Sequence, residues 1–360
     1  MAGKRWENAE TAVTWAYAEH DIAPFIARAL APGESSLVAA TSLGPFPQSL
    51  WMIRSFKRPI PDLSSRFSSR VRSSVVANPW LSRTPLHFAH QGGALEAPSS
   101  TLFAMRLAVR NHGAEALELD VHRSADGHLV VCHDESVDRT TPRTGTISQF
   151  TLEELRTFDN AFWWAPGYEA TTGLSASEYV FRGRAPEDSA LGIATVEEVL
   201  QEFPKTFLNF DIKEIGPTRY ERQLADLLRA YGRQSDVIVA SFHDDALRVF
   251  HHYAPEVHVS LGPTDTLMFY DAAVNGARMP TFDTTQVALQ IPPSFDGTQI
   301  IDSAFVTAAH NAKLAVHAWT IDDPVQMHQL LDCDVDGIIT DRPSVLAEVL
   351  RLRRDYGPLD

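Results

Sequence analysis

From residue 85 onward, short apolar segments alternate with longer segments whose apolar residues recur at helical spacing. This pattern is typical of repeated βα units around a parallel sheet. Eight such units favour a closed barrel over an open sheet. The predicted fold class is therefore α/β, a (β/α)8 TIM barrel over residues 85–354. The eight predicted strands are Leu86–His90, Glu115–Val121, Phe207–Lys213, Val237–Phe242, His258–Gly262, Thr285–Gln290, Ala315–Ile321 and Gly337–Thr340.

Helices fit between these strands because apolar residues in the connections recur every three or four positions. Five of them have a clear pattern: Ser99–Asn111, Arg219–Tyr231, Asp244–Tyr253, Pro324–Asp332 and Ser344–Arg353.

One connection is much longer than the others and follows the second strand, at about residues 126–206. An extra strand at Leu129–Asp134 and a helix at Leu152–Thr157 are predicted within it. A connection of this length in a compact barrel is usually functional or a small subdomain, so we predict an insertion subdomain here. Its aromatic residues either line a substrate cleft or form the core of the insertion: Phe162, Trp163, Trp164, Tyr168, Tyr179 and Phe181.

Residues 1–84 form a predicted N-terminal extension, partly helical or disordered. Apolar spacing in Trp6–Leu30 is compatible with a helix that Pro24 interrupts. Gly33–Thr84 is rich in Ser, Pro and Arg and has no sustained period. This basic arm either makes peripheral contact with an anionic membrane, leans on the acidic barrel, or is a solvated extension.

Composition narrows the class of protein and its partners. A chain of 360 residues with 44% hydrophobic residues can form a full core, and a net charge of −15 argues against a nucleic-acid partner. Its two cysteines, Cys132 and Cys333, have neither metal-site nor disulfide spacing. No signal peptide and no apolar run of about 18 residues is evident. These features predict a soluble, cytoplasmic protein.

Acidic side chains occupy one face of the second predicted strand. Because strand side chains alternate between faces, Glu118 and Asp120 point the same way, together with His122. Two carboxylates on an otherwise apolar strand are costly to bury unless a positive charge lies between them. A hard divalent cation with oxygen ligands is the simplest candidate.

The third strand repeats this arrangement, with Asp211 and Lys213 on one face. In barrels of this class the working residues lie at the C-terminal ends of the strands. Glu118, Asp120 and Asp211 would then form a three-carboxylate site suited to Ca²⁺ or Mg²⁺. The alternative is a carboxylate cluster that is neutralised by Lys213 and nearby Arg residues.

Two histidines, His90 and His133, bracket the acidic strand. A reaction at a metal-bound substrate needs an acid and a base, and histidine can act as either near neutral pH. This pair is therefore the predicted catalytic pair.

The stretch from His90 to Asp134 resembles the signature of the glycerophosphodiester phosphodiesterase family, in which a leading His-Arg is followed by ExD and a second His. The resemblance covers about residues 85–350. Further segments match the family in order: EAPSSTL, DGHLVVCHD, VDRTT, TLEEL, LNFDIK at Leu208–Lys213, ASF at Ala240–Phe242, WTID at Trp319–Asp322 and DGIITDRP at Asp336–Pro343. Two departures stand out, since Gln91 replaces the usual Arg and Asp211 the usual Glu.

The resemblance implies metal-dependent hydrolysis of glycerophosphodiesters to glycerol 3-phosphate and an alcohol. It implies a glycerol 2-hydroxyl that attacks phosphorus, a cyclic phosphate, and ring opening by water, with His90 favoured as the first base. Gln91, Lys213, Trp319 and Phe242 are the positions expected to contact substrate or phosphate. Gln91 offers only a neutral amide where Arg would offer a charged fork.

Two other functions remain open on the sequence alone. A lipid phosphodiesterase of the lysophospholipase D or sphingomyelinase D kind would require an apolar surface beside the site. A binding barrel that has lost turnover through Gln91 is the non-enzymatic alternative.

Overall fold

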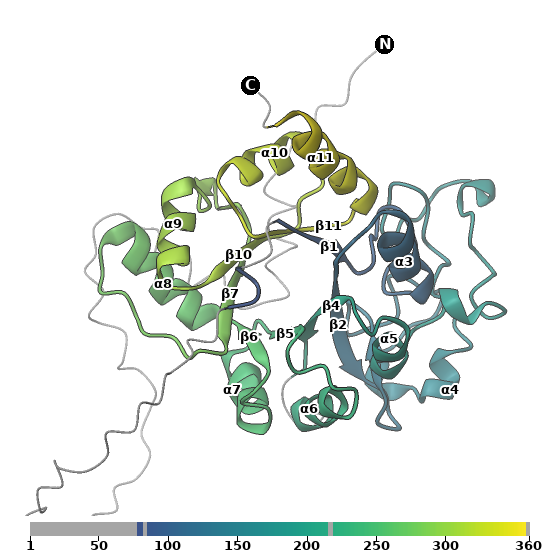
Figure 1. Ribbon diagram of the computed structural model, residues 1–360. Helices are drawn as coiled ribbons and strands as arrows, with labels where there is room; N and C mark the ends of the chain where they lie inside the picture. The colour runs from purple at the N-terminus through teal and green to yellow at the C-terminus, as the bar shows by residue number, and fades with distance from the viewer. Residues whose placement is uncertain (1–77, 82–84, 215–218, 358–360) are drawn as a thin grey trace, which may run out of the picture.

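The computed structural model describes residues 78–81, 85–214 and 219–357. Eight parallel strands within them close into a barrel, since the last strand pairs with the first. This confirms the predicted (β/α)8 TIM barrel (Figure 1). Around the barrel the strands are β1 (Leu86–His90), β2 (Ala116–Arg123), β4 (Phe207–Ile212), β5 (Val237–Ala240), β6 (His258–Ser260), β7 (Gln286–Ile291), β10 (Ala315–Ala318) and β11 (Gly337–Thr340).

Helices surround the strands (Figure 1). The sequence pattern did not single out α5, α8 or α9. In α8 only Phe269 is fully buried, while Met268 and Val274 are exposed, so its apolar residues do not follow one face. The helices are α3 (Leu102–Arg106, continued by a π-helical turn at Leu107–Asn111), α5 (Val196–Glu202), α6 (Glu221–Ala230), α7 (Asp244–Tyr253), α8 (Pro263–Asn275), α9 (Ser303–Asn311), α10 (Pro324–Asp332) and α11 (Pro343–Tyr356).

Several predicted strands end earlier than expected, at Ile212, Ala240, Ser260 and Ala318. Beyond these points only single backbone hydrogen bonds to the neighbouring strands remain among the described residues, such as Leu261 N to the Ala288 carbonyl and Trp319 N to the Ile291 carbonyl. Loops after the strands therefore carry three of the predicted site residues, Lys213, Phe242 and Trp319.

The long connection after β2 forms the predicted insertion beside α3 and α5 (Figure 1). Its strand β3 (Leu129–Val131), three residues shorter than predicted, pairs antiparallel with β2. Its helix α4 (Leu152–Leu155) begins at Thr151, whose hydroxyl accepts from Glu154 N in a capping box. The insertion has an apolar core of its own: Val130, Cys132, Val137, Ile147, Leu152, Leu155, Phe158 and Ile193.

A short segment before β1 closes the N-terminal end of the barrel. Trp80 is buried, packs edge-on against Phe207 with ring centroids 5.1 Å apart, and donates from Nε1 to His258 Nδ1 at 3.1 Å. Asn78 Nδ2 donates to the Val287 carbonyl at 2.7 Å. Residues 78–81 thus pack with the barrel, although they were predicted to belong to the extension. The predicted helix at residues 6–30 and most of the basic arm lie outside the described residues.

Among the described residues, no helix combines the length and the apolar character that a bilayer-spanning helix requires.

Two histidines are buried within the barrel and make its stability depend on pH. Burial, with some repulsion from His112, lowers the pKa of His87 to about 4, and burial lowers the pKa of His317 to about 3. In the unfolded chain both titrate near the ordinary value of about 6.5. Below that pH the unfolded state binds protons that the folded state does not, so acid destabilises the fold.

We expect the free energy of unfolding to fall by about 2–3 kcal/mol for each of these histidines between pH 6.5 and 4.5. Urea denaturation at several pH values measures this slope. His317→Asn should make the slope shallower, because Asn does not titrate in this range. The Asn side-chain oxygen can still accept the hydrogen bond from Gln290. His128→Asn, at an exposed histidine, is the control and should change nothing. An unchanged slope in His317→Asn would contradict the assignment.

Candidate active site

Three carboxylates converge at the C-terminal ends of β2 and β4. These strands pair in register, so that Asp120 lies opposite Asp211, and Glu118 lies two pairs below, opposite Asn209. Lys213 Nζ lies 2.9 Å from Asp120 Oδ1 and 2.9 Å from Asp211 Oδ2. The structure thus brings Asp120, Asp211 and Lys213 into direct contact, and Glu118 lines the same cavity.

Each of the three carboxylates keeps one buried oxygen that accepts no hydrogen bond from the described residues: Glu118 Oε2, Asp120 Oδ2 and Asp211 Oδ1. A buried carboxylate oxygen without a donor is costly. Oxygen atoms of this kind are the ligands that Ca²⁺ and Mg²⁺ prefer. The chemistry of this donor set suits a divalent cation, and Lys213 alone does not satisfy all three groups. Among the described residues, however, these three carboxylates do not form a group whose ligand atoms all lie within 4.8 Å of one another.

The ionisation of the cluster reflects the same excess of negative charge. Burial and the neighbouring Asp120 carboxylate raise the pKa of Glu118. Burial would also raise the pKa of Asp120, but Lys213, His133 and His90 hold it below its usual range. Asp120 and Asp211 outweigh the burial of Lys213 and raise its pKa well above the ordinary value, so it stays cationic.

His90 ends β1, which pairs with β2 so that His90 lies opposite Glu118. Its Nδ1 donates to Asp341 Oδ1 at 2.7 Å, because a carboxylate can only accept, and its Nε2 lies 3.6 Å from Glu118 Oε2. Burial alone would lower the pKa of His90, but Asp341, Glu118 and Asp120 together raise it to about 10. Asp341 therefore fixes the ring orientation and favours its protonated form.

His133 follows β3 and is held in the same way. Its Nδ1 donates to Asp134 Oδ1 at 2.7 Å. Arg139 Nε in turn donates to Asp134 Oδ2 at 2.7 Å, and Arg139 Nη1 donates to Glu169 Oε2 at 3.0 Å. The His90 and His133 rings have centroids 6.2 Å apart. Both histidines thus use Nδ1 for a carboxylate and leave Nε2 for other partners.

Sequence reasoning missed the carboxylates that hold the two histidines. Asp134 directly follows His133, and Asp341 lies in the segment DGIITDRP, so both had a signal in the sequence. Glu169 comes from a loop of the insertion and had none. His90, Glu169 and Asp341 present ligand atoms within 4.8 Å of one another. Because His90 Nδ1 already donates a hydrogen bond to Asp341, this group orients the histidine.

A cavity of about 340 Å³ contains the predicted catalytic and metal residues at one end. Phe242 and Trp319 also line it and contact each other edge-to-face, with ring centroids 5.9 Å apart. Gln91 does not line it, since its side chain is buried with Nε2 at 3.3 Å from His90 Nε2.

The aromatic residues of the insertion are absent from the described cavity lining. Trp164 and Tyr179 are buried, and Trp163 Nε1 donates to the Thr141 carbonyl at 3.0 Å. Arg182 stacks over the rings of Phe162 and Tyr179. The six aromatics, all of them among the described residues, therefore follow neither interpretation as a set, since none lines the cavity, none belongs to the apolar core of the insertion, and Tyr168 is 51% exposed.

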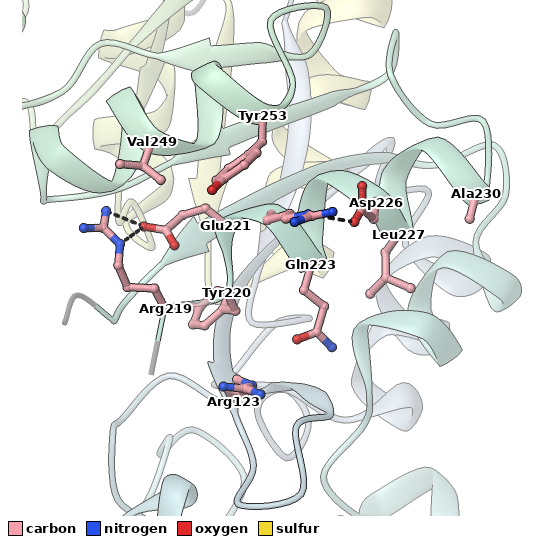
Figure 2. A pocket seen from close by; sticks show the side chains of 11 residues that line it. Arg123, Arg219, Tyr220, Glu221, Gln223, Asp226, Leu227, Ala230, Val249 and Tyr253 are labelled. Carbon is pink, nitrogen blue, oxygen red and sulfur yellow. Dashed lines mark hydrogen bonds and ion pairs between the residues drawn. The ribbon is translucent and has the colours of Figure 1, made fainter. Parts of the chain in front are cut away.

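A second hollow, of about 610 Å³, lies on the outside of the barrel along α6 and α7 (Figure 2). Its lining contains none of the predicted site residues. Arg219 is paired there with Glu221 and Asp245, both at 2.6 Å. Because the predicted catalytic and metal residues line only the first cavity, that cavity is the candidate active site.

Sequence comparisons with a family profile and with known proteins give the same family. A sequence profile of the glycerophosphoryl diester phosphodiesterase family matches residues 90–345. The glycerophosphodiester phosphodiesterase of Caldanaerobacter subterraneus is 30% identical over 271 residues, which cover 74% of this chain and 98% of that protein. A probable glycerophosphodiester phosphodiesterase 2 of Mycobacterium tuberculosis is 28% identical over 286 residues, which cover 75% and 96%.

Solved structures share the fold at lower identity. A glycerophosphoryl diester phosphodiesterase domain from Mycobacterium tuberculosis has a TM-score of 0.61 at 18% identity, covering 73% of this chain and 98% of that one. An Oleispira antarctica phosphodiesterase, solved in complex with the product sn-glycerol-3-phosphate, has a TM-score of 0.55 at 22% identity and covers 74% and 97%.

Proposed function

Because the chain belongs to the glycerophosphoryl diester phosphodiesterase family, we propose that it hydrolyses glycerophosphodiesters to glycerol 3-phosphate and an alcohol. One observation supports this most strongly. Two carboxylate-oriented histidines and three carboxylates with unsatisfied oxygens surround a single cavity. A binding barrel without turnover would have no use for this combination.

Glu118, Asp120 and Asp211 would hold the divalent cation, Ca²⁺ or Mg²⁺, through the oxygens that accept no hydrogen bond. When bound, the cation would offset the carboxylate charge that raises the pKa of His90 and would stabilise negative charge on the phosphoryl oxygens. Asp211 is one methylene shorter than the Glu of the family, so its oxygens reach less far from β4.

His90 and His133 would exchange protons with the substrate through Nε2. In the first stage His90 accepts the proton of the glycerol 2-hydroxyl while that oxygen attacks phosphorus, and His133 protonates the departing alcohol. In the second stage water opens the cyclic phosphate with the two roles reversed. Asp341 and Asp134 support both stages because each keeps its histidine in one tautomer and stabilises the imidazolium.

Lys213 is the cation closest to the carboxylates and would attract a phosphoryl oxygen as a point charge. Phe242 and Trp319 would bound the glycerol. Gln91 would act through His90, next to which its amide lies, since it does not line the cavity.

The first test is release of glycerol 3-phosphate from glycerophosphocholine, -ethanolamine, -glycerol and -inositol, with Ca²⁺, Mg²⁺ or EDTA. We expect release that requires a divalent cation, disappears in EDTA, and returns when excess cation is added, because the carboxylates need a counter-charge to bind a phosphate. Release that continues at the same rate in EDTA would contradict the metal site. No release from any of the four would contradict hydrolysis of these four glycerophosphodiesters.

Asp341→Asn tests the support of His90. Loss of the carboxylate should lower kcat by about 10–100-fold, since the ring loses its fixed tautomer. The pKa of His90 should also fall, because Asp341 is the largest contribution that raises it. A base must be deprotonated to act, so the acidic limb of the pH profile of kcat/KM should move to lower pH.

The control for this variant is Asp334→Asn, which changes an exposed carboxylate just before β11. It should leave both kcat and the pH profile unchanged. If Asp341→Asn behaves like this control, Asp341 does not position the base.

A further inference from the structure

Besides the catalytic residues, the lining of the cavity includes a group of apolar residues, and we call this part of the cavity the apolar arm. Its walls come from the end of β6, from α8, from the β8–β9 hairpin (Ser294–Phe295 and Thr298–Gln299) and from α9. All charged side chains in the described lining lie at the catalytic end. The apolar arm is lined by Leu261, Leu267, Tyr270, Phe295, Ile300 and Phe305.

This lining does not suit the alcohols of the simplest glycerophosphodiesters. Choline, ethanolamine, glycerol and inositol are small and polar or charged, and a polar group buried without a hydrogen-bond partner is costly. A methylene group, in contrast, gains free energy when it enters an apolar wall. The cavity volume of about 340 Å³ lies within the range of about 300–1,000 Å³ that is usual for ligand sites. It therefore offers room for more than a glycerol phosphate.

We propose that the apolar arm binds a single acyl chain, so that the substrate is a glycerophosphodiester that carries one chain on its glycerol. This inference rests on the proposed phosphodiesterase activity and names its substrate class. The phosphate and the glycerol occupy the charged end, and the chain extends past Phe242 and Trp319 into the arm. Leu261, Phe295 and Phe305 are almost fully buried, so this part of the wall is already formed.

The chemistry restricts the substrate to one chain. The glycerol 2-hydroxyl must be unesterified, because its oxygen forms the new bond to phosphorus while the bond from phosphorus to the head-group oxygen breaks. The head-group oxygen takes up a proton and leaves as the alcohol. Water then opens the cyclic phosphate and gives a 1-acylglycerol 3-phosphate. A phospholipid with two chains lacks the attacking hydroxyl.

The test compares glycerophosphocholine with 1-acylglycerophosphocholines of increasing chain length, each assayed as a monomer below its micelle concentration. Choline release is measured, because it reports every member of the series equally. We expect kcat/KM to rise with chain length by up to about fourfold per buried methylene, mainly through KM, until the arm is full. The wild-type protein alone suffices for this measurement.

Two variants place a charge in the arm from different walls, Leu267→Asp on α8 and Ile300→Asp after β9. Each should abolish the rise of kcat/KM with chain length, measured as the ratio of each acylated substrate to glycerophosphocholine in the same variant. The matched control is Met268→Asp, the next residue on α8, whose side chain is 50% exposed and does not line the cavity. It should retain the full dependence on chain length.

The outcomes separate this inference from the proposed activity. Turnover of glycerophosphocholine with a flat or falling chain-length series would overturn the acyl-chain inference and leave the phosphodiesterase activity standing. A rise that persists in both Leu267→Asp and Ile300→Asp would overturn it as well. Choline release from neither glycerophosphocholine nor any acylated member would overturn the phosphodiesterase activity itself, and the acyl-chain inference with it.

Discussion

Asp120→Asn is expected to lower kcat/KM for glycerophosphodiesters by about 10³-fold or more, which corresponds to the loss of several kcal/mol of transition-state stabilisation. Asp120 lies opposite Asp211 and 2.9 Å from Lys213 Nζ, and Lys213, His133 and His90 hold its pKa below the usual range against the effect of burial. An Asn there keeps the shape of the side chain but removes the charge. Both the cation and Lys213 would be held less firmly, while Asp211 still pairs with Lys213.

Rates are measured over a range of Ca²⁺ and Mg²⁺ concentrations, together with thermal unfolding to show that the fold is intact. The matched control is Glu115→Gln, which neutralises an exposed carboxylate just before the start of the same strand and should keep full activity. Wild-type turnover in Asp120→Asn at every cation concentration would remove Asp120 from the metal site.

The residues of β2 and β4 show why part of this site could be predicted. A strand exposes alternate side chains on alternate faces, so Glu118 and Asp120 had to share a face wherever the strand was placed. Asp211 follows the same rule on β4, and parallel strands of a barrel present their C-terminal ends at one rim. Local periodicity together with the fold class was therefore enough to bring these carboxylates together.

The contact between Asp341 and His90 could not be predicted in this way. It lies 251 residues from His90 along the chain, and the two meet only because β11 closes the barrel against β1. Barrel closure fixes which strands are neighbours, but no periodic pattern shows which loop side chain will reach across. Glu169 is less predictable still, because it comes from an insertion loop outside the barrel repeat.

The apolar arm was missed for a different reason. Its wall is formed largely by α8 and the β8–β9 hairpin, and α8 has apolar residues on its buried and its exposed sides. A helix of this kind gives a weak periodic signal, although it supplies Leu267 and Tyr270 to the cavity. The sequence therefore left open whether an apolar surface lies beside the site, and the structure shows apolar residues in the lining of the cavity.

His90→Ala and His133→Ala are each expected to lower kcat by about 10³-fold, and at most about 10⁴-fold, because each removes one proton-transfer partner. The double variant should lose little more than either single variant, since the two histidines act in the same transition state. Release of glycerol 3-phosphate measures all three rates. His112→Ala, a histidine outside the cavity lining, is the control and should remain fully active.

A substrate with a better leaving group separates the two roles. In glycerol p-nitrophenyl phosphate the phenolate departs without a proton, so a variant that lacks only the general acid should still complete the first stage. His133→Ala should therefore release p-nitrophenol and accumulate the cyclic phosphate, because ring opening needs His133 as the base for water. His90→Ala should release almost none, since the 2-hydroxyl keeps its proton. The reverse result would exchange the two assignments, and rapid p-nitrophenol release by both variants would show that neither histidine is the base that activates the 2-hydroxyl.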